Sequence, residues 1–226
     1  MNKKLRLNVQ NSIITIEEAA LWATTLFTAI NPIHDQISEP LKKFIYDYKG
    51  DRDGEIESEI AAGVKAGLFE SKFDFFDQDN TAVRGLREFC TAAVLEVAKH
   101  VNGQFWQEDG KCSLEFHESW FHITNHGGQH EFHYHSNCSW CGIYYVEIGD
   151  ATMENGCNRF FDPRTAAHGY SDYGTAYISE NSRFNTTPKN GNLVIFPSYL
   201  YHSAAPYEGA QDRIVVSFNS SIHHEP

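Results

Sequence analysis

The chain has 226 residues and a formal net charge of −12 at pH 7, from 18 Lys and Arg against 30 Asp and Glu. A field of that sign repels phosphate backbones, which argues against nucleic acid as a partner. No stretch reaches the roughly 20 apolar residues of a membrane span, and an odd number of irregularly spaced cysteines indicates free thiols in a cytoplasmic protein. This length favours one domain over residues 1–226.

The N-terminal part, about residues 13–104, is expected to supply supporting helices. Residues 12–30 are ambiguous between a short capped helix and a strand, because acidic and Thr-rich stretches adjoin. Apolar residues at helical spacing predict helices over 38–48 and 81–101. The aromatic stretch 69–76 is interpreted as a short strand or a clasp.

The C-terminal part, about residues 105–222, has a different sequence pattern, in which short β-like runs alternate with Gly, Asn and Pro. Several short strands behind a pair of helices predict a mainly β fold, a sandwich with helical supports. The predicted strands are 113–124, 131–135, 142–148, 159–161, 193–196 and 213–219.

Histidines are concentrated in the middle of the chain, with six of the twelve between His117 and His135. His133 and His135 are two residues apart on a predicted strand, so their side chains share one face. Neutral imidazoles side by side on a strand are a common start of a transition-metal site. His202, at the end of the run NLVIFPSYLYH, is the best candidate for the remaining ligand.

The order of three pieces carries a family resemblance: His133-x-His135, then the distal His202, then Arg213 at the start of RIVVSFN. The chain resembles the iron(II)- and 2-oxoglutarate-dependent oxygenases, in the branch related to the prolyl hydroxylases. The segments that carry the resemblance, besides HYH and GIYYV, are ESWFHIT at 118–124, ENGCNRFFDPR at 154–164, PKNGNLVIFPSYLYHSAAP at 188–206 and DRIVVSFN at 212–219.

The resemblance implies a double-stranded β-helix, or jelly roll, and a dioxygenase that uses Fe(II), 2-oxoglutarate and O2. Such an enzyme hydroxylates its substrate and releases succinate and CO2. The substrate is an unidentified small molecule or protein, with first preference for a prolyl or other amino-acid side chain. The loops at 150–158 and 165–187 are expected to set specificity, and 169–177 is interpreted as a lid.

The resemblance also assigns the site residues. His133 and His202 are implied metal ligands, whereas the position two residues after the first histidine, usually Asp or Glu, holds His135. Direct ligation by His135 is favoured, and a two-histidine site completed by water stays open, as does a carboxylate from Glu131 or Asp162.

The co-substrate end of the site follows from the same resemblance. Arg213 is expected to bind the distal carboxylate of 2-oxoglutarate through two parallel hydrogen bonds. The Tyr145 hydroxyl adds a third, while alternation turns Tyr144 away. Ser217 lies on the same face of its strand as Arg213 and is expected to line the pocket.

Two alternatives come from other classes of protein. One is a cupin-like enzyme with a three-histidine metal centre that does not use 2-oxoglutarate, for which Arg213 has no purpose. The other is a non-catalytic, metal-containing β-sandwich binding module, in which a structural zinc would usually have cysteine ligands. The lone Cys138-x-x-Cys141 is weak evidence for zinc or redox chemistry. The remaining histidines of the cluster are interpreted as structural, supporting or surface residues, namely His117, His122, His126 and His130.

Overall fold

The computed structural model describes residues 4–9, 12–17, 23–50, 65–106, 110–164 and 183–225. Strands β1 (Lys4–Val9) and β2 (Ser12–Glu17) form a two-stranded antiparallel sheet of their own. The other elements, in chain order, are β3 (Phe27–Ile30), α1 (His34–Gly50), β4 (Lys65–Glu70), the 3-10 helix η1 (Phe75–Asp77), α2 (Thr81–Asn102), β5 (Lys111–His133), β6 (Trp140–Glu147), β7 (Asn158–Phe161), β8 (Arg183–Asn185), β9 (Asn192–Pro197), β10 (His202–Tyr207) and β11 (Arg213–Glu225).

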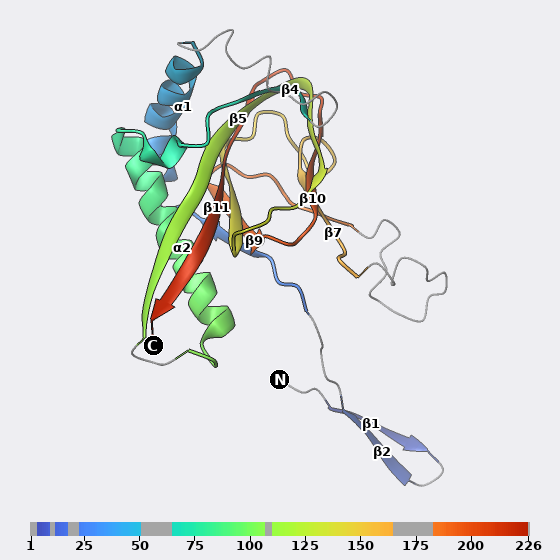
Figure 1. Cartoon of the computed structure of the whole chain (residues 1–226). Helices are drawn as coiled ribbons and strands as arrows, with labels where there is room; N and C mark the ends of the chain where they lie inside the picture. Colours follow the sequence, from blue (N-terminus) through green and yellow to red (C-terminus); the bar gives the residue numbers. More distant parts are fainter. Residues whose placement is uncertain are drawn as a thin grey trace.

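The main sheet is antiparallel throughout, with strand order β3-β9-β6-β11-β5-β10-β7-β8, and β4 pairs with β5 outside this path. The sheet is curled, so that β7 and β10 face away from the helices while α1 and α2 cover the outer side of β5 and β11 (Figure 1). This arrangement confirms the predicted mainly β fold with supporting helices.

Both predicted helices are confirmed, because 38–48 lies within α1 and 81–101 within α2. The Asn80 side chain caps α2 by accepting hydrogen bonds from the backbone N–H groups of Ala82 and Val83. Within the described residues, no helix is long and apolar enough to cross a membrane. The ambiguous stretch 12–30 contains β2 and β3, and 69–76 contains the end of β4 and the start of η1.

Alternation along the strands divides the core into two clusters. On β11, Ile214, Val216 and Phe218 pack towards the helices, whereas Val215 lies in the second cluster inside the curl. The neighbouring β6 divides in the same way, with Tyr144 on the helix side and Tyr145 inside. The helices therefore bury one face of the sheet, and the polar residues of the other face are left to line a cavity.

Strand β5 differs from the prediction of two separate strands at 113–124 and 131–135, because it runs unbroken through Gly127 and Gly128. It pairs with β11 up to Thr124 and with β10 from Gly128 onward. Gly127 has φ +81°, and a Cβ on Gly67 of β4 would lie 2.8 Å from Gly128. The glycines that were read as a break therefore form the bend at which one strand passes from one side of the curl to the other.

Candidate functional site

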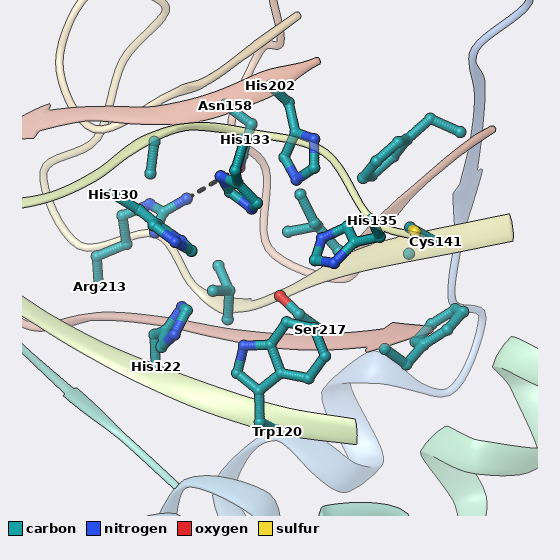
Figure 2. A pocket seen from close by; sticks show the side chains of 16 residues that line it. Trp120, His122, His130, His133, His135, Cys141, Asn158, His202, Arg213 and Ser217 are labelled. Carbon is teal, nitrogen blue, oxygen red and sulfur yellow. Dashed lines mark hydrogen bonds between the residues drawn. The ribbon is translucent and has the colours of Figure 1, made fainter. Parts of the chain in front are cut away.

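The three predicted histidine ligands come together inside the curl. Nitrogen atoms of His133, His135 and His202 lie within 4.8 Å of one another, and no other group with ligand spacing is found in the described part of the chain. His133 at the end of β5 is paired directly with His202 at the start of β10, with ring centroids 4.2 Å apart. Figure 2 shows the three rings converging on one side of the cavity.

Hydrogen bonds to the backbone fix the orientation of two of these rings. The Nδ1 atom of His133 lies 2.7 Å from the carbonyl oxygen of Glu131, and that of His202 lies 3.0 Å from the carbonyl oxygen of Leu200. A carbonyl can only accept, so Nδ1 carries the proton and Nε2 keeps its lone pair. Burial, with a smaller effect of His133, lowers the pKa of His202 well below 6.5, which keeps that ring neutral.

His135 has different surroundings, because it follows the end of β5. Its Nδ1 lies 3.4 Å from the Asn219 side-chain amide nitrogen, which also donates to a Glu118 carboxylate oxygen at 2.9 Å. The other two carboxylates considered from the sequence are engaged outside the histidine cluster: Glu131 accepts from a Gln129 side chain, and Asp162 pairs with Arg164. Neither belongs to the group with ligand spacing in the described residues.

Two further histidines line the same cavity. The pairing of β5 with β10 changes register between His130 and His133. This bulge brings the rings of His130 and His133 to the inner side, where they stack with centroids 4.0 Å apart. His122 lies beside His130 and is 2.6 Å from a Glu70 carboxylate oxygen. Sequence reasoning treated His122 and His130 as structural or supporting, whereas both contribute to the cavity wall.

Arg213 lies at the other end of the cavity, which has about 420 Å³ of empty space including its open side. The arginine is only 2% exposed, and one Nη donates to the Asn158 side-chain oxygen at 3.0 Å. Its guanidinium carbon lies 5.4 Å from the Tyr145 ring centroid. Its buried Nε has no hydrogen-bond partner among the described residues, so a buried cation keeps an unused donor beside the cavity.

The two other residues predicted for the co-substrate end take different positions. Ser217 lines the cavity, four residues and therefore two alternation steps along β11 from Arg213. Tyr145 is fully buried, and its hydroxyl donates to Asn158 at 2.5 Å and contacts Thr186 at 3.0 Å. It is not one of the residues that line the cavity. Tyr144 points to the helix side, as alternation predicts, and contacts His34.

Sequence reasoning missed two cavity residues. Asn158 accepts from both Arg213 and Tyr145, so it joins the two residues expected to bind the co-substrate. The sequence feature that could have revealed Asn158 is a polar residue two positions before the buried Phe160, on the same face of β7. The Trp120 indole also lines the cavity, and its buried Nε1 has no hydrogen-bond partner in the described structure. The cavity therefore presents unused donors as well as imidazoles, which fits an anionic ligand beside a transition metal.

Comparison with known families identifies the part of the chain that carries this cavity. Residues 118–219 match the family model described as “Putative 2OG-Fe(II) oxygenase”. The match agrees with the family resemblance predicted from the sequence. The matched range includes all three histidines and Arg213, and the metal and co-substrate in the family's description, Fe(II) and 2-oxoglutarate, are those expected from the sequence. No match was found among curated proteins.

Solved structures share the fold of this chain. A prolyl-4-hydroxylase from Pseudomonas putida is 15% identical, with a TM-score of 0.52 over 87% of this chain and 92% of that one. A prolyl hydroxylase from Trichoplax adhaerens, in complex with a hypoxia inducible factor peptide fragment, is 11% identical, with a TM-score of 0.54 over 86% and 82%. HygX from Streptomyces hygroscopicus, with nickel, 2-oxoglutarate and hygromycin B bound, is 11% identical, with a TM-score of 0.55 over 88% and 83%.

Proposed function

We propose that the protein is an Fe(II)- and 2-oxoglutarate-dependent oxygenase that hydroxylates an amino-acid or protein side chain, with His133, His135 and His202 as its metal ligands. The observation that carries this proposal is one cavity with three converging imidazoles at one end and a buried guanidinium at the other. Fe(II) bound there supplies the oxidising chemistry with O2 and 2-oxoglutarate. The protein binds, orients and shields the reactants.

Arg213 is the proposed anchor of the co-substrate. A planar guanidinium binds a carboxylate through two parallel hydrogen bonds, and burial strengthens that attraction by excluding water. Asn158 holds one Nη by a hydrogen bond, and the Tyr145 ring packs against the guanidinium, so the fork is oriented before the carboxylate arrives. Ser217 supplies a further hydroxyl on the same wall.

His135 is the proposed third ligand, in place of a carboxylate. Three neutral imidazoles leave the ion its full double positive charge, whereas a carboxylate would cancel half of it. The site should therefore attract the doubly charged 2-oxoglutarate more strongly than a site with one carboxylate ligand does. In this proposal the 2-oxo acid end of the co-substrate brings one negative charge to the metal, and its other carboxylate pairs with Arg213.

A side chain of a protein or amino acid is the proposed substrate class. Two of the structural relatives are prolyl hydroxylases, and one of these has a peptide fragment bound. The relative with hygromycin B bound makes a small molecule the second choice. Incubation with proline-containing peptides and free amino acids, followed by mass spectrometry for the gain of one oxygen atom, tests the first choice.

The test of the reaction class is an anaerobic titration of the Fe(II)-loaded protein with 2-oxoglutarate. A chelate between the two gives a weak visible charge-transfer band near roughly 500 nm. A band that rises to saturation, followed by succinate on admission of O2, supports the proposal. Bound iron with no band contradicts it and favours the cupin-like alternative.

A further inference from the structure

A pair of cysteines lies beside the histidine cluster and has no part in the proposed reaction. Cys138 Sγ is 3.9 Å from Cys141 Sγ, and both thiols are free. A disulfide requires about 2.05 Å, so an approach of about 2 Å would join them. Cys138 lies in the turn between β5 and β6, outside any strand, whereas Cys141 in β6 is paired with both β9 and β11. Cys138 is therefore the sulfur that can move.

The two thiols differ in the way that a reactive pair requires. Cys138 is half-buried and Cys141 only 2% exposed. Contact with the Cys141 thiol lowers the pKa of Cys138 to about 7, and the same contact, together with burial, raises the pKa of Cys141. The reachable sulfur is thus the better nucleophile, and the buried one is placed to react with it afterwards.

We propose that Cys138 and Cys141 form a reversible disulfide that weakens metal binding through His135. With a peroxide as oxidant, the Cys138 thiolate attacks one peroxide oxygen, the O–O bond breaks, and Cys138 becomes a sulfenic acid while hydroxide leaves. Cys141 then attacks that sulfur, the S–O bond breaks, and the leaving hydroxyl takes a proton to form water. Two thiols are oxidised and one peroxide is reduced, and a dithiol reductant reverses the step.

Two paths connect the disulfide to His135. The Cys141 S–H donates to the Asn219 side-chain oxygen at 3.2 Å, and the amide nitrogen of the same Asn219 lies 3.4 Å from His135 Nδ1. A disulfide has no hydrogen to donate, so Asn219 loses this partner. Ser198 forms the second path, because its hydroxyl donates to the Cys138 carbonyl at 2.7 Å and its own carbonyl accepts from the His135 N–H at 3.0 Å.

Movement of Cys138 therefore changes the support of His135 from both sides. Because removing a supporting contact of a metal ligand typically lowers affinity by about 10-fold to 100-fold, we expect oxidation to weaken metal binding by about 10-fold. This second half of the inference rests on the proposed function of His135, whereas disulfide formation does not.

Disulfide formation is tested on the full chain with metal removed by a chelator. After treatment with a small excess of hydrogen peroxide, we expect a loss of two thiols, a peptide that links Cys138 to Cys141 by mass spectrometry, and recovery of both thiols with dithiothreitol. Cys138→Ser should abolish the linked peptide, whereas Cys112→Ser, at a half-buried cysteine elsewhere, should retain it. Persistence of both thiols, or a linkage that uses another cysteine, overturns the proposal.

The link to the metal site is tested by calorimetric titration of reduced and oxidised protein with Ni(II), which peroxide does not oxidise under these conditions. We expect about 10-fold weaker binding after oxidation, restored by dithiothreitol, and no change on peroxide treatment of Cys138→Ser. Equal Ni(II) affinity with the disulfide present overturns the link to His135. Ni(II) binding that is absent even in reduced protein contradicts the proposed metal site instead, so the two failures are distinguishable.

Discussion

His133 and His202 lie directly opposite each other in the β5–β10 pair, and each ring contacts the backbone carbonyl two residues before it. The same local geometry is thus repeated on two antiparallel strands. Each carbonyl accepts the Nδ1 proton and leaves the Nε2 lone pair available to the proposed metal. Two of the three proposed ligands are therefore oriented by the backbone alone, before any metal binds.

Loss of either of these rings should abolish metal binding. His133→Ala and His202→Ala are each expected to lower Ni(II) affinity by more than about 100-fold, since removing even a supporting contact of a ligand costs about 10-fold to 100-fold. Calorimetry on the purified variants measures this. The control is His117→Ala, at an exposed histidine that contacts Ser221. Retained affinity in either variant would exclude that ring as a ligand.

Substitution of His135 tests the third position. His135→Asp restores the residue type usual in the resembled family, and we expect it to retain metal while binding 2-oxoglutarate more weakly, because the carboxylate cancels one charge of the ion. His135→Ala should bind metal less tightly than either protein. Calorimetry for the metal and the visible band for the co-substrate give the two readouts. Metal affinity unchanged in His135→Ala would favour a two-histidine site completed by water.

Arg213→Ala should separate co-substrate binding from metal binding. We expect 2-oxoglutarate affinity to fall by about 10-fold or more, since a charged, buried hydrogen-bond pair contributes at least 1.5 kcal/mol as a rough magnitude, while Ni(II) affinity stays the same. Arg183→Ala, at an exposed arginine of β8, is the matched control. Unchanged 2-oxoglutarate affinity would remove Arg213 from the site.

The Asn158 side chain should contribute to both stability and co-substrate binding. Asn158→Ala leaves the buried Arg213 and Tyr145 donors without their shared acceptor, so we expect a loss of about 1–3 kcal/mol in the free energy of unfolding. Tyr145→Phe removes one donor without leaving another unpaired and should cost less. Urea denaturation of the metal-free variants compares them, and a more damaging Tyr145→Phe would contradict this account.

The stability of the metal-free protein should fall below pH 6.5. The pKa of His202 is lowered from its ordinary value of 6.5 in the folded state, chiefly by burial, so below that pH the unfolded chain binds a proton that the folded chain does not. Stability is complete above pH 6.5 and decreases as pH falls towards the folded pKa, by about 1.4 kcal/mol per pH unit for one group.

Denaturation curves between pH 7.5 and 5.5 measure this dependence. His34, whose pKa burial also lowers, contributes in the same direction, so the variant His202→Asn is needed to isolate the effect of His202. The variant should have a shallower dependence on pH than the unsubstituted protein. Equal slopes would show that His202 is protonated to the same extent in both states.

Much of the site could be predicted from sequence because its residues have a fixed spacing on strands. His133 and His202 were found from order and flanking motifs, and Tyr144 was turned away from Tyr145 by simple alternation. The bend of β5 could not be predicted, because glycines that end a strand and glycines that bend one look alike in sequence. Asn158 was missed because an isolated polar residue in a short strand does not reveal which buried donors it will meet.

The bend of β5 has a consequence for the choice of co-substrate. One unbroken backbone joins Thr124, paired with Arg213, to His133, paired with His202. The separation between the guanidinium and the imidazoles is therefore determined by the path of a single strand rather than by adjustable loops. A rigid separation discriminates between dicarboxylic acids by carbon number, so acids one carbon shorter or longer than 2-oxoglutarate should be unable to contact both ends at once.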